Sequence, residues 1–292
     1  MKAFASAVTP VLAVVLVIVA AWYLGAALMN RQWVLDQAAR AGTAPPGGVE
    51  MLAETWSQDR PVLPAPHQVV AELWKGVTGH AVTSRRSLVY HGWVTLSATL
   101  LGFGIGTVMG IALAVGIVHN RAMDLGVMPW AIASQTIPIL AIAPMFVVVM
   151  NSMGLQGLLP KAAISAWLSF FPVVVGMVKG LRAPEPMQLD LLRTWNASGL
   201  TVLTRLRLPT SMAWLFASLK VAAAAALVGA IVGELPTGAV AGLGARLLQG
   251  SYYGQTVQIW AALFGAAILA AGLVALIGLA ERLVLRRMGL QR

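Results

Sequence analysis

The candidate functional residues of this sequence are polar side chains that lie inside long apolar stretches. Glu234 is an acid near the end of one stretch, Gln135 and Thr136 lie in a second, and Ser165 and Ser169 lie in a third. Polar groups inside a membrane are costly, and they are found there chiefly where they line a pathway for ions or polar molecules. We therefore expect these five residues to line a pathway or to form a gate. A carboxylate solvated at the membrane interface is an equally good interpretation of Glu234.

Other patterns that support chemistry are missing from the sequence. The phosphate-binding pattern GxxxxGK[ST] does not occur, so ATP hydrolysis cannot be assigned to this chain. The four histidines lack the spacing of metal ligands, and no Ser-His-acid or paired-carboxylate arrangement stands out. Cysteine is absent, which excludes disulfides and thiolate metal sites. The sequence therefore predicts a protein that is not itself an enzyme and that holds no metal or cofactor.

The composition is that of a protein with most of its surface in lipid. Hydrophobic residues make up 59% of the 292 residues and charged residues only 10%, whereas a soluble domain carries about 25% charged residues. The net charge of +10 could indicate a nucleic-acid-binding protein. The basic residues, however, lie at the ends of apolar segments, where membrane topology places them. We therefore predict a polytopic membrane protein that contacts lipid and not nucleic acid.

Six apolar segments are long enough to cross a bilayer, whose core of about 30 Å needs about 20 helical residues. They are residues 8–29, 95–118, 128–150, 158–181, 212–235 and 257–285. Backbone groups in lipid must be satisfied within each segment, and the segments lack the alternation of barrel strands, so we predict an all-α fold. The first segment also has features of a cleaved signal peptide. Its length and the Trp22-Tyr23 pair near its end favour a retained helix.

Lysine and arginine in the short loops predict the orientation of the chain. With the amino terminus inside, most basic residues of the short loops fall on the inner side, as the positive-inside rule requires. Both termini are then cytoplasmic. The predicted organisation is a transmembrane helix at 1–30, an external segment at 31–91, a membrane core at 92–285 and a cytoplasmic tail at 286–292. Lys220, in the fifth segment, is expected to extend towards the cytoplasmic surface.

Small residues recur at helical spacing in two of the segments. Lipid provides no hydrophobic drive for helix association, so small faces allow close backbone packing instead. We favour packing within one chain, and the alternative is a dimer interface. The residues concerned are Gly102, Gly106 and Gly110 in the second segment and Ala222, Ala226 and Ala230 in the fifth.

The external segment 31–91 divides at a Pro-Pro-Gly-Gly turn at residues 45–48. After the sequence Leu-Pro-Ala-Pro at 63–66, apolar residues recur with helical spacing from 69 to 77, so we expect an amphipathic helix in the interface plane. Residues 31–61 either contact a soluble partner protein or form a solvated insertion. We favour the insertion.

Residues 186–209, which we call the elbow, form a polar, basic stretch between two long apolar runs. Apolar residues fall on one face of each of two short predicted helices, and residues 196–199 can turn the chain between them. Asn196 tolerates the left-handed conformation of a sharp turn better than most residues. Such a pair of helices can insert apolar anchors into a groove on a partner, and the alternative is a loop that lies on the bilayer. We favour docking, carried by Asp190, Leu191, Leu192, Arg193, Trp195, Asn196, Ala197, Ser198, Leu206, Leu208 and Pro209.

The spacing within the elbow resembles the cytoplasmic coupling loop of permease subunits of ABC importers. In that family the loop reads Glu-Ala-Ala, three residues, Gly, nine residues, Ile, one residue, Leu-Pro. This sequence keeps the same spacing, but several residue types differ. The corresponding residues are Asp-Leu-Leu at 190–192, Asn196, Leu206 and Leu-Pro at 208–209. The sequence resembles the nitrate, sulfonate and taurine importer type from residue 63 to the carboxyl end. The further matches are 63–66, 137–141 with Pro144, 170–172, 233–234 and 242–244.

This resemblance implies a type I ABC importer, with two permease subunits, two ATPases and a soluble substrate-binding protein. The chain would be one permease subunit of the cell (inner) membrane, paired with a second copy or a paralogue. Its elbow would dock an ATPase subunit, and ATP and Mg would be bound by that partner. The implied solutes are nitrate, aliphatic sulfonates, taurine or pyrimidine-type precursors.

Two alternatives belong to other classes of protein. A secondary transporter or channel would work without an ATPase, but it is expected to show inverted repeats and charged residues at mid-membrane. It also leaves the spacing of the elbow unexplained. A membrane-embedded enzyme would need clustered His, Asp or Glu residues, which the sequence lacks. We therefore predict a permease subunit that transmits displacement from an ATPase to its spans.

Overall fold

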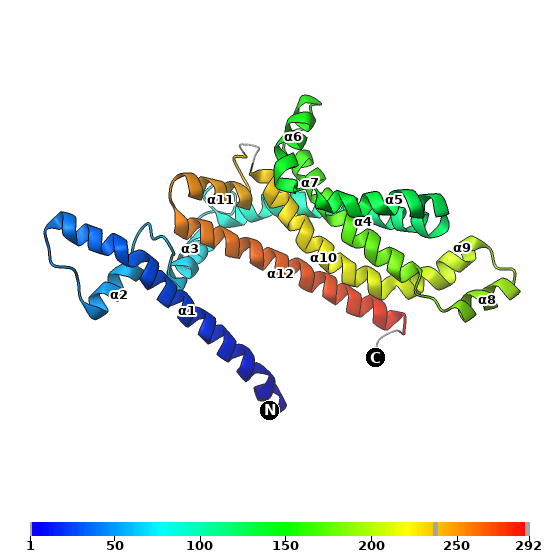
Figure 1. The fold of residues 1–292 in the computed structure, drawn as a ribbon, viewed down its shortest axis with the longest axis horizontal. Coiled ribbons are helices and arrows are strands. Elements are labelled where there is room, and N and C mark those ends of the chain that lie inside the picture. Colours follow the sequence, from blue (N-terminus) through cyan, green and yellow to red (C-terminus); the bar gives the residue numbers. More distant parts are fainter. Residues whose placement is uncertain (1, 236–238, 290–292) are drawn as a thin grey trace. The chain divides into compact units, whose positions relative to one another are not determined.

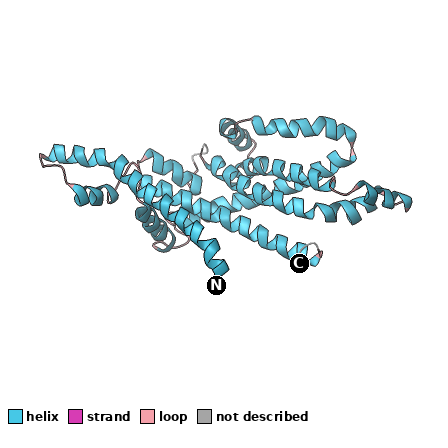
Figure 2. Cartoon of the chain, turned by 60° about the horizontal axis from the view of Figure 1, so that its bottom comes forward, coloured by secondary structure: helices cyan, strands magenta, loops and turns pink. Residues whose placement is uncertain are grey.

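The computed structural model describes residues 2–235 and 239–289, with side chains from residue 9 onward. All regular structure in this part of the chain is helical, and none of it is strand (Figure 2). The predicted all-α fold is therefore confirmed. The chain divides into two compact units, Met1–Tyr90 with Arg246–Gly265 and His91–Ala245 with Ala266–Arg292.

Twelve α-helices and two short turns of other helix types follow one another along the described residues (Figure 1). They are α1 (Lys2–Ala41), α2 (Gly48–Trp56), α3 (Pro66–Thr78), α4 (Leu88–His119), α5 (Arg121–Ala133), the 3-10 turn η1 (Ser134–Thr136), α6 (Ile139–Ser152), α7 (Leu158–Leu181), α8 (Pro186–Thr194), α9 (Gly199–Val202), the π-helical turn η2 (Leu203–Arg207), α10 (Leu208–Glu234), α11 (Leu243–Tyr252) and α12 (Thr256–Arg287).

Five stretches of helix are long and apolar enough to cross a membrane. They are Thr9–Ala41, Leu88–His119, Leu158–Leu181, Gly199–Glu234 and Thr256–Arg287. Each contains one of the predicted segments, apart from the end residues 8 and 235. A bent pair of helices brings the total to six if it counts as one span. The prediction of about six spans is therefore confirmed at that count.

The third predicted segment, residues 128–150, is not one straight helix. Arg121–Thr136 and Ile139–Ser152 meet at a bend of 102°. Ile137 is extended, with φ −78° and ψ 120°, because the ring of Pro138 disfavours helical backbone at the preceding residue. Pro138 therefore interrupts this segment, and the bend is far larger than a kink within one span.

Residues 31–41 continue α1, and residues 42–61 fold back against α1 in the first unit. The side chain of Asn30 is fully buried and donates to the carbonyl oxygens of Thr55 (3.0 Å) and Leu63 (2.9 Å). Its oxygen accepts from the backbone N–H groups of Val62 (2.8 Å) and Leu63 (3.2 Å). The Gln58 side chain donates to the carbonyl of Asn30 at 3.1 Å. The segment is therefore a helical hairpin of α1 and α2, held where the apolar part of α1 ends.

Close packing against α7 organises the second unit. A Cβ atom at Gly110 of α4 would lie 2.8 Å from Cβ of Val173, and one at Gly229 of α10 would lie 2.7 Å from Cα of Ser165. Both distances are shorter than real side chains allow, so glycine is what lets these backbones approach. Gly102 and Gly106 meet α7 in the same way. For these positions the prediction of packing within one chain is confirmed.

Apolar side chains fill the centre of this unit. Val173, Val174, Met177 and Leu181 of α7 are each no more than 1% exposed. They form one buried cluster with residues of α4 and α10, including Ala114, Ile117 and Ala222. The helix α7 therefore positions both the elbow at its carboxyl end and the polar residues at its amino end.

Candidate functional site

The elbow begins with α8, and residues at the amino end of this helix stabilise its first turn. Pro186 occupies the first turn of α8, where its missing N–H costs no hydrogen bond. The side chain of Gln188 accepts from the N–H of Glu185 at 3.2 Å, and the N–H of Gln188 donates to the Glu185 carbonyl at 3.0 Å. These reciprocal bonds fix the direction in which the chain leaves α7 for the elbow.

The turn that ends α8 is built around Asn196. Its φ of 50° is the one positive φ of a non-glycine residue in the described chain. The N–H of Asn196 donates to Arg193 (2.9 Å) and the N–H of Ala197 donates to Leu192 (3.0 Å), which is the Schellman arrangement of a helix end. Asn196 therefore takes the left-handed conformation that asparagine tolerates better than most residues.

The second arm of the elbow continues into a membrane span without interruption. Ser198 caps α9 by accepting from the N–H of Thr201 at 3.2 Å. The helix then widens to a π turn, in which the N–H of Leu208 donates to Leu203, five residues earlier. Pro209 follows directly, and its ring would clash with the carbonyl of Arg205 in a regular α-helix. The wider turn relieves that clash, so α9, η2 and α10 form one helix from Gly199 to Glu234.

Apolar side chains of the elbow lie open to the surroundings of this chain. Trp195 and Leu200 are each 70% exposed and Leu191 is 53% exposed. No residue from 185 to 210 is buried. Asp190 and Arg193 form an exposed ion pair at 2.9 Å, which contributes little to stability. The elbow is thus ordered by its backbone bonds and not by a core of its own.

Both ends of the elbow are fastened to the second unit. Arg207 donates to the carbonyl of Leu181, the last residue of α7, at 2.9 Å. At the same level Gly180 meets Ser211, where an added Cβ would lie 2.7 Å from the serine Cβ. Arg182 forms an ion pair with Asp124 of α5 at 2.8 Å. The ends of α7 and α10 are therefore held together beneath the elbow.

The residues expected to line a pathway do not gather at one place. Gln135 and Thr136 are exposed on the turn η1, beside the bend at Pro138. Ser165 is fully buried and donates to the carbonyl of Ala226 at 2.8 Å. Ser169 is also fully buried, and it donates to the carbonyl of Ala166 at 3.2 Å. Ser165 therefore links α7 to α10, whereas the two residues of η1 are exposed.

Glu234 is fully buried, so the interpretation as a carboxylate in water at the interface is wrong. It accepts from the hydroxyl of Thr95 (2.9 Å) and from the N–H of Gly244 (2.8 Å). The ammonium of Lys161 lies 3.8 Å from its Oε1 atom. Sequence reasoning missed Thr95 and Lys161, which lie far from Glu234 along the chain. The two motifs at 233–234 and 242–244 were the available signal, since both recur in the family that the sequence resembles.

Lys220 has a partner that the sequence did not suggest. Its ammonium forms an ion pair with Glu281 of α12. Pairing compensates two charges in a low-dielectric position. The expectation that Lys220 extends towards the cytoplasmic surface stays a prediction, and the ion pair adds a link between α10 and α12.

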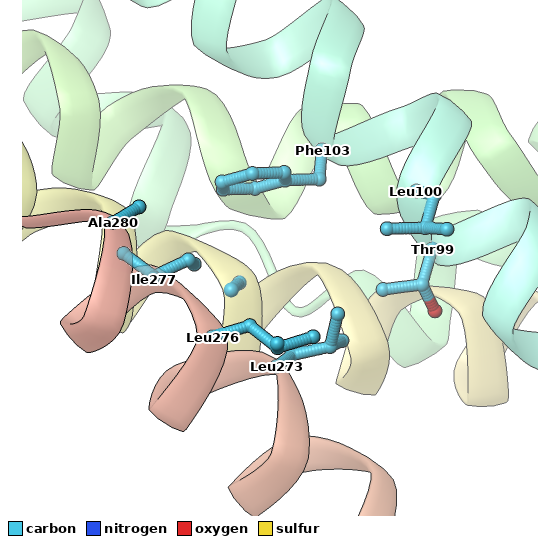
Figure 3. A pocket seen from close by; sticks show the side chains of 8 residues that line it. Thr99, Leu100, Phe103, Leu273, Leu276, Ile277 and Ala280 are labelled. Carbon is cyan, nitrogen blue, oxygen red and sulfur yellow. The ribbon is translucent and has the colours of Figure 1, made fainter. Parts of the chain in front are cut away.

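A hollow of about 260 Å³ lies between α4, α10 and α12. Figure 3 shows Leu100 and Phe103 of α4 on one side and Leu273, Leu276 and Ile277 of α12 on the other. Thr99 brings the one hydroxyl among its lining side chains, and this hydroxyl donates to the Thr95 carbonyl at 2.8 Å. The hollow is thus apolar and offers little to recognise a polar solute.

Comparison with known proteins places these features in one family. Residues 106–290 match the family described as "Binding-protein-dependent transport system inner membrane component". A probable ABC transporter permease protein of Haemophilus influenzae is 30% identical over 214 residues, which cover 73% of this chain and 82% of the relative. The formylaminopyrimidine transport permease protein ThiX of Halalkalibacterium halodurans is 31% identical, over 63% of this chain and 68% of the relative. The riboflavin transport system permease protein RibX of Chloroflexus aurantiacus is 29% identical, over 77% of this chain and 80% of the relative.

A solved structure has the same fold. A chain from the methionine ABC transporter MetNI in an inward-facing conformation matches with a TM-score of 0.55 and 18% identity. The match covers 70% of this chain and 96% of the other. The arrangement of helices is therefore that of a type I importer permease.

Proposed function

Since the chain belongs to the family of binding-protein-dependent transport system inner membrane components, we propose that it forms the translocation pathway of an ATP-driven importer and docks the ATPase through its elbow. As a member of this family it is a membrane-embedded permease component. Membership of this family also argues against the alternative of a secondary transporter or channel, which would work without an ATPase. ATP hydrolysis is then the work of a partner subunit, which binds ATP and Mg, and this chain supplies the passage.

The observation that carries the proposal is the exposed and internally ordered elbow. Trp195 and Leu200 are each 70% exposed, and large apolar side chains gathered on a surface mark sites of interaction. The turn at Asn196 holds the two arms in one arrangement, so little conformational entropy is lost when a partner covers them. A groove that accepts spaced helical anchors on an ATPase is the partner surface that fits.

A displacement of the elbow reaches the spans by two connections. One arm is continuous with α10 through η2. The same arm is also tied to α7, because Arg207 donates to the carbonyl of Leu181. Because α7 and α10 share the core of the second unit, they move together when the ATPase pulls on the elbow. Rocking of these helices then opens the passage to one side of the membrane at a time.

The complete importer contains further subunits in this proposal. A second copy of the chain or a paralogue forms the other half of the passage, and a soluble substrate-binding protein delivers the solute. The membrane is the cell (inner) membrane, and both termini lie in the cytoplasm with the elbow. Gln135 and Thr136, exposed at the broken third span, are the pathway residues that we retain.

The solute is a small organic or inorganic molecule selected by the binding protein. Two relatives are named for formylaminopyrimidine and riboflavin transport. We therefore place nitrogen heterocycles of the pyrimidine type first among the possible solutes. Nitrate, taurine and aliphatic sulfonates are the other class, and uptake of labelled compounds from both classes distinguishes them.

The test of docking compares two tryptophans of equal exposure. Trp195 lies in the elbow and Trp74 lies in α3 of the first unit, and each is 70% exposed. We expect Trp195→Ala to lower the amount of ATPase that co-purifies in mild detergent by about tenfold or more, because buried tryptophans dominate interfaces. Trp74→Ala should leave it unchanged. Adding Leu192→Asp to Trp195→Ala should abolish both ATPase retention and uptake.

Equal ATPase retention in the two tryptophan variants, together with unchanged uptake in the double variant, rules out docking through the elbow. The amount of the chain in the membrane is measured in parallel, so that poor insertion is not mistaken for lost docking.

A further inference from the structure

Four side chains from three helices converge on one short backbone segment of the second unit, residues 241–244. The Lys161 ammonium donates to the carbonyl of Ala241 at 3.2 Å. His91 Nδ1 accepts from the N–H of Gly242 at 3.0 Å, and the Thr95 hydroxyl oxygen accepts from the N–H of Leu243 at 2.8 Å. Glu234 accepts from the N–H of Gly244 at 2.8 Å. We call this set of contacts the clamp.

The backbone of the segment packs closely against the Glu234 side chain. Gly242 has a φ of 128°, a conformation that only glycine adopts readily. A Cβ atom there would collide with the Glu234 carboxylate. At Gly244 an added Cβ would lie 2.9 Å from the Cβ of Glu234. The segment can therefore approach Glu234 this closely only because residues 242 and 244 are glycines.

The helices α4, α7 and α10 of the clamp pack against one another along their lengths, and the segment, which ends in the first two residues of α11, meets them at the clamp. The helices α4 and α7 pack through Gly102, Gly106 and Gly110, and α7 and α10 pack through Gly229 and Gly233. This packing runs along the helices well beyond the clamp, so the four side chains keep their positions. The segment 241–244, in contrast, is held at each of its four residues by a side-chain hydrogen bond.

If the segment 241–244 stayed bound permanently, apolar side chains could hold it, and the charges of Lys161 and Glu234 would not be needed. Burying a carboxylate and an ammonium costs more than burying apolar side chains of the same size. Lys161 and Glu234 lie 3.8 Å apart, and each also bonds to the segment. When the segment leaves, the two charges can still compensate one another, which an unpaired charge could not do. The ion pair thus lowers the free energy of the released state as well as that of the closed state.

We propose that the clamp is a latch whose release is one step of the transport cycle, with Glu234 as its main positioning residue. In the closed state the segment 241–244 lies across the ends of α4, α7 and α10. Release frees the segment and admits water to Thr95 and Glu234. The cyclic part of this inference rests on the proposed function, since ATP turnover by the partner drives the release.

The chain contains no cysteine, so a single introduced cysteine reports on the latch directly. Ala245 directly follows the segment and is 2% exposed. We expect Ala245→Cys, in nanodiscs with the co-purified ATPase, to react slowly with a water-soluble maleimide at rest. Mg and ATP should accelerate the reaction about tenfold, the change expected when closed and open states become comparably populated. Val240→Cys, at a position 64% exposed, should react rapidly in every condition.

Two threonines of α4 provide a matched pair of variants. Thr95 bonds to both Glu234 and the segment, whereas Thr99 donates only to the Thr95 carbonyl in the described contacts, and both are fully buried. In the Ala245→Cys background, Thr95→Val should accelerate labelling at rest about tenfold, since it removes hydrogen bonds of buried groups. Thr99→Val should not.

Equal labelling in the two threonine variants overturns the latch, and so does a labelling rate that ATP turnover leaves unchanged. The turnover measurement uses a chain with an intact clamp, so it stands even if Thr95→Val fails to fold. Failure of the proposed function has a different signature. In that case no ATPase accompanies the unaltered chain, while the difference between Thr95→Val and Thr99→Val at rest persists.

Discussion

Asn196 takes a backbone conformation that few residues adopt, at the turn between the two arms of the elbow. Its φ of 50° and the two hydrogen bonds around it reverse the chain within a few residues. Asparagine occupies the left-handed region at a smaller cost than most residues, and a β-branched side chain occupies it at a larger one. The geometry of the elbow therefore depends on the backbone of a single residue.

A substitution series at this position tests that dependence. Asn196→Gly should keep the turn and leave uptake close to its original rate. Asn196→Val should destabilise the turn by about 1–2 kcal/mol, the cost of the left-handed conformation for such a residue. Hydrogen exchange of residues 186–199 measures the turn, and exchange should be faster in the valine variant alone. Identical exchange in the two variants would contradict this account of the turn.

At the residue scale, the sequence showed that Asn196 could take the conformation of a sharp turn, whereas it gave no sign of the side chains that meet Glu234. The spacing of the elbow placed Asn196 where a turn was needed, and the local preference of asparagine did the rest. Glu234, in contrast, meets Thr95 across 139 positions of sequence. Neither residue carries a local signal of the other, because their contact depends on how α4, α7 and α10 pack.

At the scale of elements, apolar length and proline explain most of the fold. A run of apolar residues long enough for the bilayer gives a helix, and each predicted segment other than the third lies within its helix apart from end residues, although three of these helices extend well beyond the segment at one end. Pro138 indicated an interruption of the third span, but the bend of 102° depends on what surrounds the two halves. The helical hairpin of α1 and α2 was not foreseen, because Asn30 binds mainly backbone groups of residues 55–63, which leave no pattern in the sequence.

Glycines of α4 permit a direct test of element packing. Gly110 faces Val173 and the carbonyl of Phe170, whereas nothing lies within 4 Å of a Cβ at Gly104. We expect Gly110→Ala to destabilise the protein by about 1–3 kcal/mol through overpacking. Gly104→Ala should be neutral or stabilise the helix by up to about 1 kcal/mol. Thermal unfolding in detergent measures both, and a stable Gly110→Ala variant would show that α4 and α7 do not pack this closely.

At the scale of the whole molecule, the features of the second unit form one line of mechanical connection. The elbow joins α10 without a break, Arg207 ties it to α7, and the opposite ends of α7 and α10 carry Lys161 and Glu234 of the clamp. A movement of the elbow can therefore reach the clamp through helices that are stiff and closely packed. The central claim in this connection is that the elbow touches an ATPase.

The measurement that tests this claim most directly is cross-linking from the tip of the elbow. Leu200 is 70% exposed, and the chain has no other cysteine to compete with Leu200→Cys. A photoactivatable cross-linker attached there in native membranes should join the chain to an ATPase subunit, identified by mass spectrometry through its nucleotide-binding sequence. Adducts with phospholipid alone, and none with an ATPase, would contradict the account.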